Sequence, residues 1–412
     1  MKQYPPVSFA ALLMAVVGLP SCVDHGQSRL AFASADAFED LPMPAAAAGQ
    51  PKADPAKRGR IVLVTIDGVR AEDVFEGADP SLRPGSDVAS FRRPEAVMPR
   101  TYRLVATRGV ALGAERKGCG AVHTASGANI SLPGYLEIFT GRRTRCRDNN
   151  CDRTTSPTVM DEAVHAGIAP VASIGSWEIL DRAVSNRSFP ITHASGADPS
   201  MPAPVPMLVA EGTQRWPEPR PITNDVLEQL VAVGERAEAY PGHGRYRPDA
   251  STTAIALEYL RSAKPAFLHV GLGDPDEYGH RNDYPAYLSS IGEADAFIGK
   301  VADTLDAMGE LGARTTVIVT TDHGRNRDFQ HHGAYSLSSA RTFVLAFGAH
   351  VATRGVACPA HDVTLADIAP TIRVLTGLPS DPSRESGHPI EEIVGVGSLP
   401  IASLGSVARA AP

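Results

Sequence analysis

Continuously apolar runs alternate with amphipathic patterns along most of the chain. The apolar runs are short and rich in β-branched residues, without alternation of polar and apolar positions, which predicts strands buried on both faces. They cover residues 60–68, 169–177, 265–276, 315–324 and 342–348. Helical patterns lie between them, over residues 156–167, 223–240, 251–263, 284–308 and 364–377. This alternation predicts an α/β fold with a doubly wound, mostly parallel central sheet flanked by helices on both faces.

The amino-terminal segment has the layout of an export signal. Lys2 precedes a short apolar run over residues 9–19, which is too short to span a bilayer. The residues LPSC follow and end at Cys22, and they resemble a bacterial lipobox. We therefore predict a lipoprotein-type signal peptide over residues 1–21 and lipidation at Cys22. Pro20 is unusual in a lipobox, so ordinary signal cleavage is the alternative.

The segments outside the strand and helix patterns differ in composition. Residues 22–58 are rich in Ala, Pro, Asp and Gly, and this composition predicts a disordered tether. A folded domain is expected over residues 59–395, with a proline-rich insertion at about 195–222 beside the site. Residues 396–412 form a tail of small residues.

Composition and charge narrow the classes of partner. Of the 412 residues, 43% are hydrophobic and 21% are charged, as in soluble globular proteins, and the formal net charge is -7. A mildly negative net charge does not indicate a basic surface for binding nucleic acid. We expect a small-molecule substrate, membrane contact only through the lipid anchor, and a location in the bacterial periplasm or on the outer membrane. The sequence leaves the oligomeric state open.

The cysteines agree with an exported protein. Apart from Cys22, four cysteines remain, and they allow three pairings. Cys146 and Cys151 are close in sequence, so we expect a local disulfide between them, with Cys119–Cys358 as the second bridge. A zinc site is the alternative, but the spacing of these cysteines is poor for zinc.

Carboxylates and imidazoles follow three of the predicted strands. Asp67 ends the first strand, Asp276 and His280 follow the third, and Asp322 and His323 follow the fourth. One such Asp is usually a turn or cap residue. Because parallel strands end at one edge of a sheet, where ligands bind, three such ends together point to divalent cations of the Zn²⁺ type.

The motifs TIDGVR, NISLPGYLEIFTGR, GDPDEYGH and VTTDHG, in this order, resemble the alkaline phosphatase superfamily of phosphatases, phosphodiesterases, sulfatases and cofactor-independent mutases. With DIAPTIRVLTGLP, the resemblance covers about residues 60–380 and makes the domain alkaline phosphatase-like. It implies two divalent metal ions, Zn²⁺ or alternatively Mn²⁺. Carried over to this sequence, the resemblance implies that one ion is bound by Asp67, Asp322, His323 and the nucleophile Ser131. It implies that the other ion is bound by Asp276, His280 and His332, with His331 as the alternative to His332.

The placement of Ser131 suits a nucleophile. Pro133 favours the first turn of a helix, which puts the hydroxyl at a helix N-terminus, where an anion such as phosphate is stabilised. The alternative is that Ser131 only caps the helix. The sulfatase signature C/S-x-P-x-R lacks its arginine here, because Tyr135 replaces it. An unmodified serine suits phosphoryl transfer.

The resemblance also implies a side chain that binds the phosphate oxygens. Asn149 or Asn150 matches the position where relatives place an Asn, and Arg142 and Arg143 are further candidates. We therefore expect a metal-dependent phosphate ester hydrolase with a phosphoseryl intermediate. Diester, phosphonate or sulfate ester hydrolysis is the alternative within the superfamily. A binding lipoprotein that keeps the fold without turnover is the alternative of another class.

Overall fold

The computed structural model describes residues 58–82, 89–197, 209–212, 224–334, 336–379 and 387–394. These residues all lie in one compact unit, residues 48–412. The predicted signal peptide, Cys22, most of the tether, most of the proline-rich insertion and the carboxy-terminal tail lie outside the described residues.

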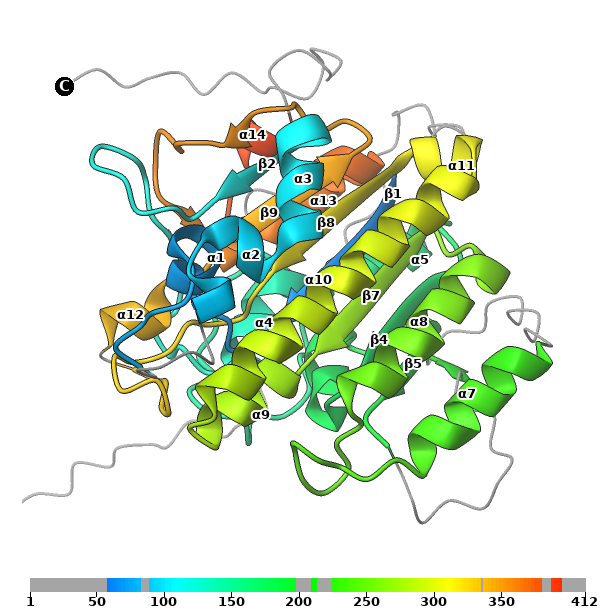
Figure 1. Ribbon diagram of the computed structural model, residues 1–412. Coiled ribbons are helices and arrows are strands. Elements are labelled where there is room, and N and C mark those ends of the chain that lie inside the picture. Colours follow the sequence, from blue (N-terminus) through cyan, green and yellow to red (C-terminus); the bar gives the residue numbers. More distant parts are fainter. Residues whose placement is uncertain are drawn as a thin grey trace, which may run out of the picture. The chain divides into compact units, whose positions relative to one another are not determined.

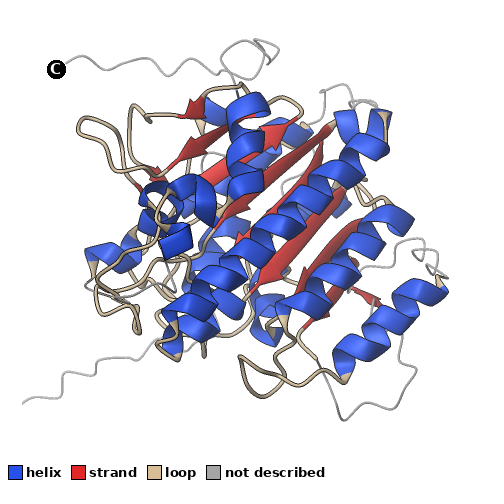
Figure 2. Cartoon of the chain, viewed as in Figure 1, coloured by secondary structure: helices blue, strands red, loops and turns tan. Residues whose placement is uncertain are grey.

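Strands and helices alternate along the described chain (Figures 1 and 2). The strands are β1 Arg60–Ile66, β2 Gly109–Leu112, β3 Val122–His123, β4 Val171–Gly175, β5 Ile191–Ser195, β6 Val209–Glu211, β7 Phe267–Leu272, β8 Thr315–Thr320, β9 Val344–Gly348, β10 Gly355–Val356 and β11 Val363–Thr364. The helices are α1 Ala71–Glu76, α2 Pro94–Val97, α3 Pro99–Arg108, α4 Ser131–Thr140, α5 Val159–His165, α6 Asp181–Val184, α7 Asp225–Glu235, α8 Asp249–Ala263, α9 Asp274–His280, α10 Tyr284–Ala307, α11 Glu310–Ala313, α12 Leu337–Ala340, α13 Ile368–Thr376 and α14 Glu391–Val394.

Within the described residues, nine strands form one sheet in the order β10-β2-β9-β8-β1-β7-β4-β5-β6. Only β9 and β6 run antiparallel to the other strands of this sheet. Strands β3 and β11 pair separately. The central strands β1, β7 and β8 are mostly apolar and, apart from Arg60, buried, as their mostly apolar patterns predict.

Helices cover both faces of the sheet. Figure 1 shows α3, α8 and α10 across one face and α4, α5 and α13 behind it. The core on the first face packs apolar side chains of α8 and α10 against alternate residues of β1 and β7, such as Val62, Val64 and Leu268. This arrangement confirms the predicted doubly wound, mostly parallel α/β fold. No helix in the described ranges combines the length and apolar character needed to cross a membrane.

The register of the central strands brings their carboxyl ends to one level. Ile66, the last residue of β1, lies beside Leu272, the last residue of β7. On its other side, Thr65 of β1 lies beside Thr320, the last residue of β8. The loops that carry the predicted acidic residues therefore start side by side.

Candidate active site

The first cluster consists of Ser131, Asp67, Asp322 and His323, and all four are buried. The Ser131 Oγ lies 3.3 Å from Asp67 Oδ1 and 3.1 Å from His323 Nε2. The same His323 Nε2 is 3.4 Å from Asp67 Oδ1 and 3.4 Å from Asp322 Oδ2. The oxygens and nitrogens of Asp67, Asp322 and His323 are close enough to hold one metal ion.

The second cluster consists of Asp276, His280 and His332. Helix α9 places Asp276 and His280 one turn apart, with His280 Nε2 3.0 Å from Asp276 Oδ2. The His332 Nε2 lies 3.1 Å from His280 Nε2 and 3.9 Å from Asp276 Oδ1. His332 also stacks on His323 of the first cluster, with ring centroids 3.9 Å apart. The two clusters therefore adjoin one another.

Of the two rival histidines, the structure brings His332 to the cluster. The His331 side chain is exposed, and its Nδ1 lies 3.0 Å from Asp328 Oδ2. Asp328 also accepts a hydrogen bond from the backbone N–H of His331, so one side chain holds His331 in the surface turn.

Backbone carbonyls orient two of the imidazoles. The Nδ1 of His323 lies 2.8 Å from the Gly324 carbonyl, and the Nδ1 of His332 lies 3.1 Å from the Asn129 carbonyl. Because a carbonyl only accepts, each Nδ1 carries a proton and each Nε2 faces the clusters.

The clusters suit divalent cations. Asp322 Oδ2 is buried and has no hydrogen-bond donor among the described residues. Burial raises the pKa of Asp322 well above its usual value, and the neighbouring Asp67 raises it further. The carboxylates raise the pKa of His323 to about 10, although burial opposes this. Buried carboxylates so close together need a positive partner, which a proton or a metal ion supplies.

Helix α4 begins at Ser131, which places the hydroxyl at the helix N-terminus. The preceding turn contains Asn129, whose φ of 52° is in the left-handed region that Asn tolerates. The helix passes so close to the end of β8 that a Cβ on Gly134 would collide with the Asp322 carbonyl. Glycine at this position lets Ser131 approach the carboxylates.

The candidates for binding the phosphate oxygens differ in their distance from the start of α4. The Asn149 Oδ1 accepts a hydrogen bond from the Leu132 backbone N–H at 3.0 Å, which places Asn149 beside the start of α4. Asn150 is exposed, and its backbone N–H donates to Asp148. Arg142 and Arg143 follow the opposite end of α4, about 15 Å along the helix from Ser131. The structure therefore does not bring these two arginines to the site.

Both expected disulfides are present. Cys146–Cys151 closes the loop that carries Asn149, with a Cα–Cα distance of 5.9 Å. Cys119–Cys358 joins segments 239 residues apart in the sequence.

Two residues that contact the clusters were not predicted to do so. The Tyr135 hydroxyl donates to Asp67 Oδ2 at 3.2 Å. The Arg325 guanidinium donates to Asp276 Oδ1. Burial alone would raise the pKa of Asp276, but Arg325, with His332 and His280, holds it well below the usual value. Tyr135 offered a signal in replacing the sulfatase arginine, and Arg325 in following the DHG motif directly.

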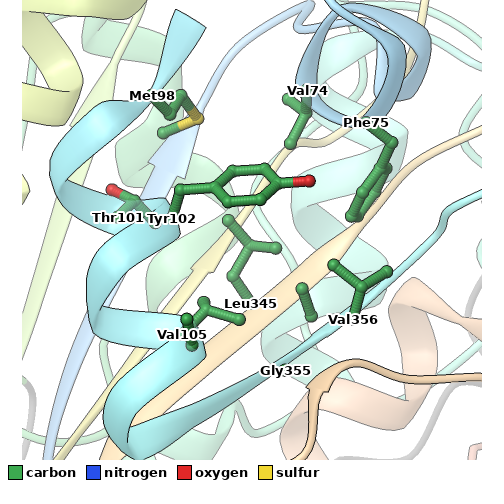
Figure 3. Close-up of a pocket in the computed structure, with 11 residues that line it drawn as sticks. Val74, Phe75, Met98, Thr101, Tyr102, Val105, Leu345, Gly355 and Val356 are labelled. Atoms are coloured by element: carbon green, nitrogen blue, oxygen red, sulfur yellow. The ribbon is translucent and has the colours of Figure 1, made fainter. Parts of the chain in front are cut away.

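A separate pocket lies between α1, α3 and the strands β9 and β10 (Figure 3). Its lining is mainly apolar and includes Phe75, Met98, Tyr102, Leu345 and Val356. No residue of either cluster lines it, so it is not part of the candidate active site.

A family model matches the part of the chain that carries Asp276, His280, Asp322, His323 and His332. Residues 243–380 match the family model described as Metalloenzyme superfamily. A 2,3-bisphosphoglycerate-independent phosphoglycerate mutase of Thermomicrobium roseum is 27% identical over 166 residues, which are 35% of this chain and 30% of the mutase. The chain thus matches about a third of the length of such a relative.

Solved structures share the fold. Alkaline phosphatase PafA is 13% identical with a TM-score of 0.52, over 84% of this chain and 100% of that one. The phosphonate monoester hydrolase of Agrobacterium radiobacter is 17% identical with a TM-score of 0.50, over 82% of this chain and 77% of that one. At these identities, the likeness shows an alkaline phosphatase-like fold.

Proposed function

We propose that this chain, which by its fold and metalloenzyme match belongs to the alkaline phosphatase superfamily, is a phosphate ester hydrolase with Ser131 as its nucleophile. One observation carries the proposal. The Ser131 Oγ stands at a helix N-terminus within 3.3 Å of a cluster of buried carboxylate and imidazole groups.

The residues of the two clusters fit two divalent cations, for which we propose Zn²⁺, with Mn²⁺ as the alternative. The first cluster would hold one. The second cluster would hold the other, with Asp276 and His332 also close to His323 and with His280 beside them. When bound, such cations lower the pKa of a serine hydroxyl and neutralise phosphate oxygens.

The chain's own groups then account for binding and displacement. The positive end of the α4 dipole favours the phosphoryl oxygens, and Asn149 lies beside it through its hydrogen bond to the Leu132 N–H. After losing its proton to solvent, Ser131 Oγ forms a bond to phosphorus while the bond to the leaving oxygen breaks, and the leaving group takes a proton from solvent and departs as the alcohol. Water then attacks the phosphoserine, and the serine hydroxyl and inorganic phosphate are released.

Two observations favour phosphate over sulfate esters. Tyr135 occupies the place of the sulfatase arginine, and its hydroxyl is already committed to Asp67. The serine therefore lacks the signature for oxidation to formylglycine. We also propose export to the periplasm through the amino-terminal signal, which the two disulfides support. Diester and phosphonate substrates remain alternatives within the same site.

The test is a panel of phosphate monoesters, diesters, phosphonates and sulfate esters with metal-analysed protein. Ser131→Ala should lower the rate on the best substrate by about 10³-fold or more while the protein stays folded. Rapid quenching of the wild type should trap one phosphoryl group on Ser131 by mass spectrometry.

The matched control is Ser262→Ala, which removes a hydroxyl of α8 that donates to the Glu258 carbonyl and to no cluster residue in the described chain. It should keep full activity. Full activity in Ser131→Ala would refute the role of the serine. A folded, metal-loaded wild type that turns over no ester would favour the binding lipoprotein.

A further inference from the structure

Arg325 is a buried cation in direct contact with the second cluster. Its side chain has no exposed surface, and Nη1 donates to Asp276 Oδ1. Its Nε donates to the Phe329 carbonyl at 2.5 Å and its Nη2 to the Gln330 carbonyl at 2.8 Å. Because a guanidinium stays charged in a protein, Asp276 Oδ1 is committed to it, and Oδ2 is the oxygen nearest to His280.

Glycines make room for this guanidinium. A Cβ on Gly279 would collide with the Arg325 Cζ, and a Cβ on Gly68 would lie 2.9 Å from its Nη1. Gly68 directly follows Asp67, and Gly279 directly precedes His280. The backbone around both clusters therefore accommodates the buried charge of Arg325.

The two clusters consequently differ in net charge. The first cluster contains two carboxylates, and in the described chain the ion pairs of Asp67 and Asp322 are with His323 alone. The second cluster contains one carboxylate, whose charge Arg325 already balances. A divalent cation would be neutralised in the first cluster but would leave net positive charge in the second, which is costly in a poorly solvated site.

We propose that Arg325 makes the two cation sites unequal, so that the first cluster holds its cation tightly and the second cluster holds its cation weakly and exchanges it. This inference rests on the proposed two-cation function. It further assigns Arg325 as a positioning residue that sets the occupancy of the second site.

Zinc binding to the metal-free, full-length chain tests the inference. Calorimetric titration with Zn²⁺, and removal of zinc by a graded chelator series with elemental analysis, should each show two separate steps of one ion per chain. Two steps of equal affinity would overturn the inference and leave the proposed function standing. A folded chain that binds no zinc would overturn both.

Variants then assign the difference to Arg325. Arg325→Gln should tighten the weak step by about 10- to 100-fold and leave the tight step unchanged, whereas Arg325→Lys should retain two separated steps. Weakening of both steps in Arg325→Gln would instead show a purely structural role. If neither variant folds, the wild-type titration decides the matter.

Arg247→Gln is the matched control. Arg247 is also fully buried, and it donates to the carbonyls of Gly175, Ala194 and Gly196 rather than to a cluster residue. Its zinc titration should match that of the wild type.

Discussion

Tyr135 orients one carboxylate of the first cluster from within the core. Its ring is buried in α4, and its hydroxyl donates to Asp67 Oδ2, which leaves Oδ1 facing the Ser131 hydroxyl. Burial, reinforced by Asp67, raises the pKa of Tyr135 well above its usual value, so the hydroxyl remains a donor. Tyr135, which replaces the arginine of the sulfatase signature in the sequence, thus orients Asp67 in the structure.

Removing this hydroxyl should impair turnover more than folding. Tyr135→Phe keeps the ring and frees Asp67 Oδ2, so kcat should fall about 10-fold or more with a smaller change in KM. Steady-state kinetics at saturating zinc, with thermal unfolding alongside, measure this. Tyr259→Phe, in the buried face of α8, should leave kcat unchanged. An unaltered kcat in Tyr135→Phe would show that Asp67 needs no such support.

At the scale of elements, the Cys146–Cys151 loop links α4 to its surroundings. The loop returns along α4 to place Asn149 Oδ1 on the Leu132 N–H. From the other side, Arg182 Nη1 donates to the carbonyls of Asn149 and Cys151 at 3.4 and 3.1 Å. The disulfide and the arginine together hold Asn149 at the start of the nucleophile helix.

Removing the two disulfides should therefore affect KM and stability to different degrees. Replacing Cys146 and Cys151 with serine should raise KM for the phosphate ester about 10-fold and cost only about 2 kcal/mol of stability, because the closed loop is short. Replacing Cys119 and Cys358 with serine opens a loop of 239 residues and should cost about 5 kcal/mol with little change in KM. Kinetics and urea unfolding of both double variants measure this. The same KM in both would rule out a positioning role for the short disulfide.

The mostly apolar strands of the sheet could be predicted from sequence, but β2, β5 and β10 could not. Strands β1, β7 and β8 lie within the predicted runs 60–68, 265–276 and 315–324, although each strand ends two to four residues before its run does. Strands β2 and β10 are too short to show a pattern, and β5 includes polar positions. Their places in the sheet depend on tertiary pairing.

The contacts of the residues that follow the strands could be predicted only where the position in the sequence alone determines them. Asp67 directly follows β1 and Asp322 is the second residue after β8, so the shared edge of the sheet brings them together. The choice between His331 and His332 depends on the turn that Asp328 stabilises, and the contact of Arg325 depends on space left by distant glycines. Such tertiary features leave little trace in one sequence.

At the scale of the whole molecule, His269 links three strands through the core. It lies in β7, with its Nε2 3.0 Å from Thr65 Oγ1 of β1 and its Nδ1 2.8 Å from Ser173 Oγ of β4. The Phe139 ring of α4 packs edge-on against it, with centroids 4.8 Å apart. Burial lowers the pKa of His269 to about 3. The imidazole is thus neutral in the folded protein, and its protonation favours unfolding.

This buried imidazole should make the folded state sensitive to acid. Between pH 6.5 and 3 the unfolded chain binds a proton at His269 that the folded chain does not, so stability falls as the pH falls through this window. Between pH 7.5 and 4.5 the loss should be about 3 kcal/mol, at 1.36 kcal/mol per pH unit below 6.5. His269→Gln should remove this part of the pH dependence, whatever its stability at neutral pH. Denaturant unfolding in excess chelator at both pH values measures the difference, and the exposed His361, changed to Gln, should leave the acid loss as in the wild type. An equal acid loss in His269→Gln would mean that other groups cause the sensitivity.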